Sequence, residues 1–405
     1  MKPVRSACTL SAALAVAMVS TVSFAGTAGA APCGGSGGGS SGFGSSSSGT
    51  DPDGPQGPLP VLSGSTRTVA WVTGPVSANR TNTRFSISGT DLGIMWDNGG
   101  TGAQKQILSA MGDTFGDCSV DGQQWRRNVL MRSSDANLAD GITVPNPQPG
   151  NLYAGSPVTA AAPNFSREIL PSIGVYGVEA TVVPTAGISV GGTQYVNFMS
   201  VRAWGEPGVW DTNASTIATS TDNGENWIPV ATTTRVNTPL DVPGIQQLAL
   251  GNSNFQQHAY VKNGGFVYDY GTPNGRFGPA HVARIPEAQI LDLAAYEYWN
   301  GSAWVLGDAD AATPVFGPEV GEMSVHWNGS KYIAVYGNER LGRIDMRTSP
   351  TPEGPWSEPR ALVTSSQIAG LYAPYIHPWS TGNDLYFVAS RWEDYNIMLL
   401  HTTID

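Results

Sequence analysis

Four carboxylates lie in or at the ends of strand-like stretches of the chain, and for Glu179 and Glu322 the stretch is one in which a charged side chain is costly without a partner or a task. They are Asp91 in GTDLG, Asp113 in GDTF, Glu179 in GVEA and Glu322 in GEMSV. Two carboxyl groups held near each other divide into a proton donor and an ionised partner. Glycoside hydrolysis needs such a pair, because one carboxyl protonates the leaving oxygen while the other activates water or attacks the anomeric carbon. The residues alone leave Asp91 and Asp113 evenly open between this chemistry and a structural role as turn caps.

Several polar and aromatic residues are candidates for holding a sugar beside these acids. Aromatic rings can stack on sugar faces, although packing is the simpler explanation for any single tryptophan. We take His377 as a buried histidine or a hydrogen-bonding group, since the scattered histidines and cysteines match no metal-ligand spacing. We therefore expect neither a metal nor a cofactor, and we find no nucleophile elbow, HExxH or phosphate loop. The candidate substrate-binding residues are Trp204, Gln257, Tyr268, Arg276, His377 and Trp379.

The elements that must position these residues form one repeated unit. A Gly/Asn turn precedes an apolar strand with period-two alternation, and each such strand has one strand before it and one after it. The five central strands are expected at residues 105–115, 193–202, 265–274, 331–340 and 384–393. Five copies predict an all-β, five-bladed β-propeller in a single domain, with the first strand of each copy lining a central funnel. A β-sandwich or jelly roll is the alternative fold.

Two local features refine this picture. The sequence STDNGENW at residues 220–227 is an Asp-box hairpin turn, in which we expect Asp222 to bond the amides of its own turn. The strongest helix candidate is the short amphipathic stretch 286–298.

The N-terminal part of the chain is typical of an exported protein. Lys2 and Arg5 precede an apolar run and small residues, which predicts a signal peptide at residues 1–31. Residues 32–65 are rich in Gly, Ser and Pro and are expected to form a disordered tether, followed by the propeller at 66–405. Cys33 and Cys118 could pair with each other outside the cell, or Cys33 could remain a free thiol or pair with another molecule.

Composition narrows the possible partners. The net charge is −11, no basic cluster occurs, and no apolar run after residue 31 is long enough to cross a bilayer. We therefore expect a secreted or cell-wall-associated monomer that does not insert into a membrane after signal cleavage and does not bind nucleic acid.

A series of ordered motifs from residue 66 to the end of the chain resembles one known family. They include GTDLGIMWDNGG, GDTFG, YVNFMSVRAWGEPGVWDTN, VYDYGTPNGRFG, LYAPYIHPW and LYFVASRWEDYNIMLLHT. The family consists of secreted actinobacterial proteins, first catalogued as a domain of unknown function and later assigned as endo-D-arabinanases. The resemblance implies a five-bladed propeller that cuts the D-arabinan of arabinogalactan or lipoarabinomannan internally, with the aspartates of GTDLG and GDTF as catalytic residues.

On this basis we expect Asp91 to be the nucleophile or general base and Asp113 to be the complementary acid or a group that tunes the pKa of Asp91. Glu179 and Glu322 are reserve candidates for the acid. Two other readings stay open. The protein could be a non-catalytic propeller that binds cell-wall carbohydrate, or a sialidase-like hydrolase. A sialidase would need a tyrosine nucleophile and an arginine cluster, for which Arg202, Arg276 and Arg347 are available.

Overall fold

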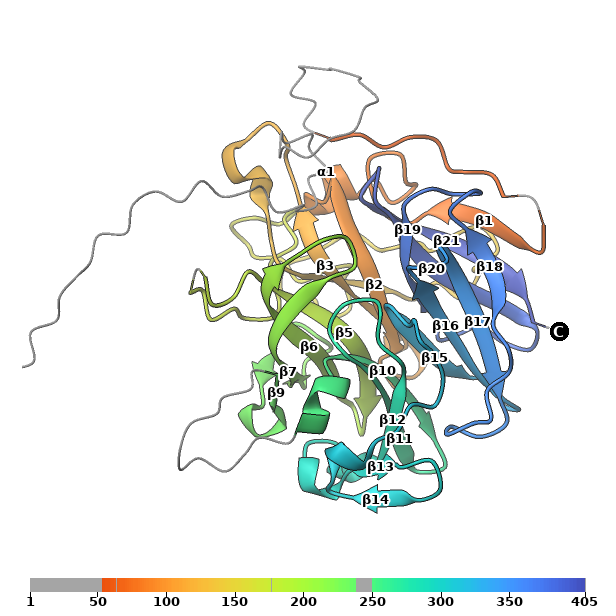
Figure 1. Cartoon of the computed structure of the whole chain (residues 1–405). Helices are drawn as coiled ribbons and strands as arrows, with labels where there is room; N and C mark the ends of the chain where they lie inside the picture. Colours follow the sequence, from red (N-terminus) through yellow and green to blue (C-terminus); the bar gives the residue numbers. More distant parts are fainter. Residues whose placement is uncertain (1–52, 63, 176, 238–249, 405) are drawn as a thin grey trace, which may run out of the picture.

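The computed structural model describes residues 53–62, 64–175, 177–237 and 250–404, which form five antiparallel sheets around a central axis (Figure 1). Blade 1 contains β2 (Gly89–Asp97), β3 (Ile107–Phe115) and β4 (Val129–Ser133). Blade 2 contains β5 (Thr181–Val190), β6 (Thr193–Trp204), β7 (Trp210–Ser220), β8 (Ile228–Pro229) and β9 (Arg235–Val236). Blade 3 contains β10 (Gln257–Asn263), β11 (Phe266–Thr272), β12 (His281–Pro286), β13 (Glu297–Trp299) and β14 (Trp304–Leu306).

Blade 4 contains β15 (Met323–Trp327), β16 (Tyr332–Asn338), β17 (Arg343–Ser349) and β18 (Arg360–Thr364). Blade 5 contains β19 (Leu371–Ile376), β20 (Asp384–Arg391), β21 (Asn396–Thr403) and, on its outer edge, β1 (Thr66–Trp71). Because β1 pairs with β21, the beginning and the end of the propeller share one sheet, which closes the ring.

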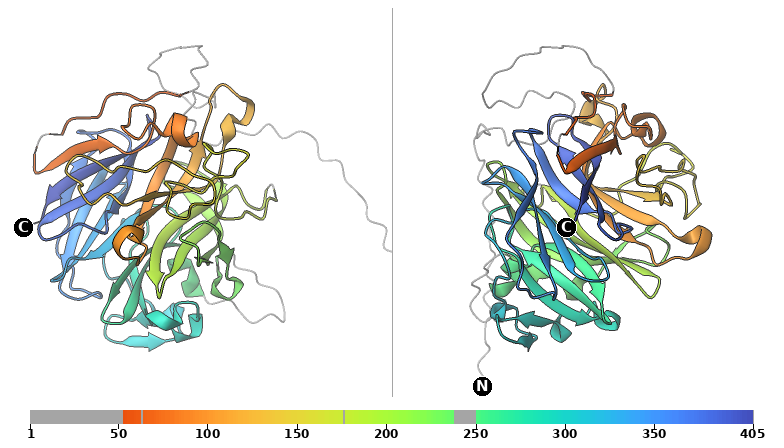
Figure 2. Two further views of the ribbon diagram at one scale, coloured as in Figure 1. Left: turned by 180° about the vertical axis from the view of Figure 1, so that it is seen from behind. Right: turned by 90° about the vertical axis from the view of Figure 1, so that its right-hand side faces the viewer.

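The first strands of the blades form the inner ring. β2 contacts β5, β5 contacts β10, β10 contacts β15, β15 contacts β19, and β19 returns to β2 (Figure 2). Apolar side chains from both faces of the strands fill the spaces between neighbouring blades in four hydrophobic clusters. Neighbouring sheets thereby cover each other's faces, and the arrangement leaves only short outer edges. The five-bladed, single-domain prediction is confirmed, and the sandwich alternative is excluded.

Helical structure is sparse in the described residues. The α-helix α1 spans Thr81–Phe85. The helix expected at residues 286–298 is not present, and that stretch forms two 3-10 turns followed by β13. The side chain of Asp292 accepts a hydrogen bond from the amide of Ala294, so it starts a new turn where a helix would have continued. Asp222 bonds Ser220 and Asn226 within its own turn, as expected for an Asp-box.

The N-terminal expectations fall largely outside the described residues, which exclude the predicted signal peptide, Cys33 and most of the predicted tether. The described part of that tether is not loose. Gln56 donates to the carbonyl oxygen of Thr73, and the amide of Gly57 donates to Asp394 at 2.7 Å. Cys118 is disulfide-bonded. Among the described residues, no helix combines the length and apolar character that a bilayer crossing demands.

Candidate active site

One mouth of the central channel opens into a cavity of about 350 Å³. All five inner strands begin at this mouth, where Asp91, Val183, Gln257, Met323 and Tyr372 line the cavity. The same strands end at a second cavity of about 340 Å³ at the opposite mouth. The two ends of each inner strand therefore face different cavities, and Asp91, Asp113 and Glu322 line the first of them.

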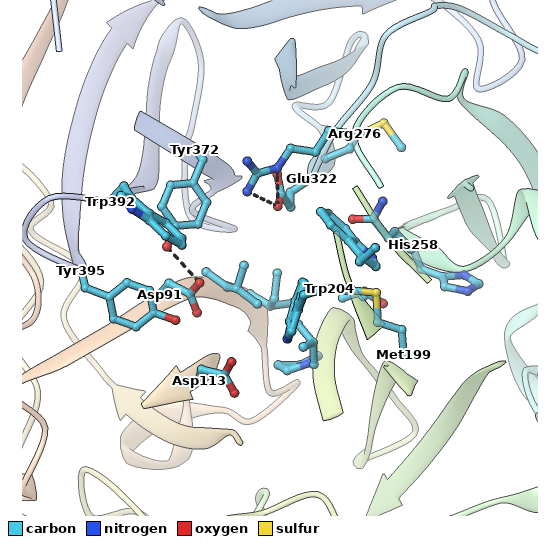
Figure 3. Close-up of a pocket in the computed structure, with 18 of the residues that line it drawn as sticks. Asp91, Asp113, Met199, Trp204, His258, Arg276, Glu322, Tyr372, Trp392 and Tyr395 are labelled. Carbon is cyan, nitrogen blue, oxygen red and sulfur yellow. Dashed lines mark hydrogen bonds and ion pairs between the residues drawn. The ribbon is translucent and has the colours of Figure 1, made fainter. Parts of the chain in front are cut away.

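A double irregularity in the β2–β3 hairpin aims two aspartates at this cavity. Thr90 pairs with Thr114 and Leu92 pairs with Met111, so that Gly112 and Asp113 together face the single residue Asp91. This two-against-one pairing is a β-bulge, a device that re-aims side chains next to functional sites. Figure 3 shows the carboxyl groups of Asp91 and Asp113 on one side of the cavity.

The backbone after Asp91 is held in an unusual conformation. Leu92 has a φ of 69°, in the left-handed region that side chains other than glycine rarely adopt, and Gly93 follows it with a φ of 78°. The amide of Leu92 donates to the hydroxyl of Ser390 at 2.9 Å, so blade 5 supports the distortion. Strained backbone of this kind is concentrated at functional sites.

Asp91 is surrounded by groups that favour its protonated form. Burial, followed by the negative charge of Asp113, raises the pKa of Asp91 to about 8, and a weaker contribution comes from Glu322. The hydroxyl of Tyr372 donates to Asp91 Oδ2 at 2.9 Å, which offsets only part of this effect. Asp91 Oδ1 is buried without a hydrogen-bond partner among the described residues.

Asp113 is the more acidic member of the pair. Burial raises its pKa to about 6, while hydrogen bonds from Thr181 and Trp125 and the charge of Arg127 hold it down. Thr181 Oγ1 donates to Asp113 Oδ1 at 2.7 Å. Because burial and the charge of Asp113 raise the pKa of Asp91 further than burial raises that of Asp113, Asp91 is the member of the pair that binds a proton more readily.

Across the cavity, Glu322 is committed to an ion pair with Arg276. Arg276 Nε and Nη2 reach Glu322 Oε1 at 3.0 and 2.9 Å, and Nη1 reaches Glu339 at 3.1 Å. The guanidinium also lies 5.0 Å from the ring centre of Tyr372. Burial lowers the pKa of Arg276, but Glu322 more than compensates, so Arg276 stays charged. This paired geometry suits a positioning role for Glu322 better than the reserve acid role.

Gln257 supports the same network from blade 3. Its side-chain amide donates to the carbonyl oxygens of Pro273 and Gly275 at 3.0 and 2.7 Å, which anchors the loop that carries Arg276. Arg276, Tyr372 and Asp91 thus form a chain of contacts from blade 3 through blade 5 to blade 1.

Aromatic rings contribute a large part of the remaining wall. Trp204 and Trp210 meet edge to face at 5.7 Å between ring centres, and Trp392 lies 5.9 Å from Tyr372 and 6.1 Å from Tyr395. Trp392 is 47% exposed, so much of its ring is free to contact a ligand. The full lining is Asp91, Leu92, Ile94, Asp113, Phe115, Trp125, Val183, Pro184, Thr185, Met199, Trp204, Trp210, Gln257, His258, Arg276, Glu322, Met323, Tyr372, Trp392 and Tyr395.

The structure brings six of the predicted site residues to this cavity, and four lie elsewhere. Glu179 accepts hydrogen bonds from the hydroxyls of Ser172 and Ser200 and anchors the loop before β5. Tyr268 packs against Trp304 and Tyr332 between blades 3 and 4. These two residues have structural partners and do not line the cavity.

His377 and Trp379 follow the end of β19, toward the opposite mouth of the channel. Burial lowers the pKa of His377 to about 3, so this histidine is neutral. The indole of Trp379 bonds Asp97, a residue of the second cavity. The sequence placed His377 and Trp379 at the substrate site only because the two ends of an inner strand, which face different cavities, were not distinguished.

Tyr372, Tyr395 and Trp125 line the cavity but were not among the sequence candidates. Tyr372 lies at the start of the fifth inner strand, a place equivalent to Asp91 in the first. Aligning the starts of the five repeats would have identified it.

A second constellation has the connectivity of a catalytic triad but not its accessibility. His258 Nδ1 lies 2.7 Å from Asp269, and Nε2 lies 3.1 Å from Ser215 Oγ. However, Ser215 is fully buried and donates to the carbonyl oxygen of Phe255. A nucleophile needs access to its substrate, so these residues join blades 2 and 3 structurally.

The arginine cluster that a sialidase would need does not form around this cavity. Arg276 lines it, but Arg202 pairs with Asp211 and Arg347 bonds Tyr336 and the carbonyl oxygen of Ser357. Burial raises the pKa of Tyr372 well above its usual value, which opposes a role as an ionised nucleophile.

Comparisons with known proteins place this arrangement among relatives. "Notoamide biosynthesis cluster protein J" from Aspergillus sp. (strain MF297-2) is 29% identical over 331 residues, covering 76% of this chain and 81% of that protein. A Bacteroides ovatus protein described as a candidate hydrolase has a crystal structure that is 14% identical with a TM-score of 0.51, covering 80% and 88% of the two chains. A GH43_1 enzyme from Xanthomonas citri is 13% identical with a TM-score of 0.43, covering 80% and 89%.

At 14% identity, the Bacteroides ovatus structure informs the fold and not the chemistry. The match to a family model is more extensive, since it runs from residue 76 to residue 401 and includes both aspartates and every residue that lines the cavity. The chain belongs to the family described as "Domain of unknown function (DUF4185)".

Proposed function

We propose that this protein is a glycoside hydrolase whose acid and carboxylate are Asp91 and Asp113. The observation that carries the proposal is the placement of Asp91 and Asp113 opposite each other across the β2–β3 bulge, in one cavity, with the pKa of Asp91 raised further than that of Asp113. Two titratable groups pushed apart in this way supply a proton donor and an ionised base or nucleophile at the same pH. The reaction needs no further cofactor.

The roles follow from which carboxyl holds the proton. Asp91 donates it to the glycosidic oxygen that leaves, and ionised Asp113 activates water or attacks the anomeric carbon. This reverses the division expected from the sequence, in which Asp91 was the base or nucleophile. Tyr372 holds Asp91 in place through its hydrogen bond, and the Arg276–Glu322 pair fixes Tyr372 from the far side.

The substrate we propose is the D-arabinan of actinobacterial arabinogalactan or lipoarabinomannan, cut within the chain by an exported enzyme. The resemblance of the ordered motifs to endo-D-arabinanases supports this choice. The cavity walls are compatible with it, because Trp204, Trp210 and Trp392 offer flat apolar faces beside polar groups. Furanose rings present such mixed surfaces.

A panel of polysaccharides tests the proposal. The mature protein is incubated with purified mycobacterial arabinogalactan, with an L-arabinan and with xylan, and products are followed by chromatography. We expect arabino-oligosaccharides of several lengths from the first substrate only. Binding to arabinogalactan without release of any product would favour a non-catalytic wall-binding protein, and release from xylan or L-arabinan would move the proposal to another glycan.

A further inference from the structure

Gly112 lies in the β2–β3 bulge, directly against the carboxyl group of Asp91. A Cβ atom at Gly112 would come within 2.4 Å of Asp91 Oδ1 and within 3.0 Å of the Leu92 side chain. The φ of Gly112 is outside the left-handed region, so the backbone itself would accept another residue. The contact with Asp91 is therefore the main reason for a glycine here.

The bulge holds Gly112 firmly in this place. Thr114 Oγ1 donates to the carbonyl oxygen of Gly112 at 2.9 Å, and Thr114 Oγ1 also lies 2.7 Å from Thr90 Oγ1. Both threonines are fully buried. A side chain added at Gly112 would consequently displace the carboxyl group of Asp91 more readily than the backbone of β3.

The space beside Gly112 determines how Asp91 Oδ1 meets water. This oxygen is buried without a hydrogen-bond partner among the described residues. A carboxyl oxygen that water cannot reach makes the ionised form unfavourable. Asp91 therefore favours its protonated form because of where its carboxyl group lies, and the missing side chain of Gly112 leaves room for the carboxyl group in that position.

We propose that Gly112 is a positioning residue of the active site, whose missing side chain lets Asp91 Oδ1 lie against β3 and so makes Asp91 the proton donor. The inference rests on the proposed function for its catalytic meaning, but its physical content is independent of any substrate. The titratable and charged groups that face Asp91 are Asp113 on β3, Tyr372 on β19, Tyr395 in the β20–β21 hairpin, Glu322 before β15 and, beyond Tyr372, Arg276.

The fold provides a matched control at Gly337, in the second strand of blade 4. Its amide donates to the carbonyl oxygen of Glu322, so it faces an inner-strand carboxylate as Gly112 does. A Cβ atom there would lie 3.9 Å from Glu322 Oε2, which is ordinary van der Waals contact. Gly337→Ala makes the same chemical change without displacing a carboxyl group.

The first readout needs no substrate. Thermal unfolding at pH 5 and pH 8 measures by how much Asp91→Asn raises Tm at each pH. The increase should be larger at pH 8, because the neutral amide does not ionise there. We call the difference between the two increases the extra rise at pH 8. In the Gly112→Ala background, the extra rise at pH 8 should shrink by at least about half, since the displaced carboxyl is better hydrated. In the Gly337→Ala background, it should be unchanged. An extra rise of the same size in both backgrounds would overturn the inference.

If Gly112→Ala destabilises the protein, a double variant still tests whether Gly112 positions Asp91. If the damage comes from the Asp91 contact, the drop in Tm caused by Gly112→Ala should largely disappear when Asp91→Ala is also present. A drop of equal size in the two backgrounds would mean that Gly112 serves the backbone and does not position Asp91.

The second readout is activity on D-arabinan. Gly112→Ala should lower kcat by about 10- to 100-fold, as expected for a misplaced catalytic group, and should shift the alkaline limb of the pH profile downward by about one unit. Gly337→Ala should change neither. An unshifted alkaline limb would contradict the inference. A wild type without activity but with the unfolding result above would refute the proposed function and leave the role of Gly112 standing.

Discussion

The stability of Asp91→Asn as a function of pH tests whether Asp91 keeps its proton in the folded protein. Burial, with the charge of Asp113 second, raises the pKa of Asp91 from 3.8 to about 8. A group with a higher pKa in the folded state stabilises the fold fully below its unfolded pKa, and this contribution is lost as the pH rises through the folded pKa. Wild type should therefore lose stability between about pH 4 and pH 8, whereas an asparagine does not titrate.

The size of the effect follows from the shift. Each pKa unit corresponds to about 1.4 kcal/mol, so the interval from pH 5 to pH 8 gives an upper limit of about 4 kcal/mol. Water in the cavity hydrates part of the carboxyl group, so we expect about 2–4 kcal/mol. For a domain of this size, Asp91→Asn should therefore raise Tm by roughly 3–6 °C more at pH 8 than at pH 5.

Thermal and urea unfolding of wild type and Asp91→Asn at the two pH values measure this difference. Because the chain carries a net charge of −11, removing any negative charge could stabilise it slightly. Asp140→Asn, on an exposed loop of the same blade, controls for that general effect. The reasoning is refuted if Asp91→Asn gains no more at pH 8 than at pH 5, or no more than Asp140→Asn gains.

Three further outcomes follow from the site. The pH profile of kcat/KM should be bell-shaped, rising near pH 6 as Asp113 ionises and falling near pH 8 as Asp91 loses its proton; activity that still increases at pH 9 would contradict the assigned roles. Trp392→Ala should raise KM about tenfold with little change in kcat, because it removes an exposed apolar face and no reacting group; an equal loss in kcat would count against this. Gly57→Pro removes the amide that donates to Asp394, a residue of the hairpin that carries Trp392, so it should lower Tm by roughly 1–3 °C and raise KM. Gly57→Ala keeps this amide and should change neither Tm nor KM. Equal effects of the two Gly57 variants would argue against this hydrogen bond.

The sequence revealed the blades because their signals are local. Period-two alternation between Gly/Asn turns marks a strand without knowledge of its neighbours, and β16 and β20 start within one residue of the expected positions. Asp91 and Asp113 lie on the two strands of one hairpin, so their proximity could also be predicted from the sequence.

Contacts between residues far apart in the sequence could not be predicted from such local patterns. The hydrogen bond from Tyr372 to Asp91 joins residues 281 positions apart, and the pairing of Arg276 with Glu322 links a loop of blade 3 to blade 4. The sequence offered Glu322 as an acid because it cannot show which charge faces it. The order of the two aspartate pKa values likewise depends on burial that only the assembled cavity creates.

The most direct test of the account is release of arabino-oligosaccharides from D-arabinan by wild type, Asp91→Asn and Asp113→Asn at pH 7, with circular dichroism to establish that each variant is folded. We expect product from wild type and a loss of at least about a thousandfold in both folded variants, because each removes one half of the acid–carboxylate pair. A folded variant of either aspartate that still releases product at the wild-type rate would contradict it.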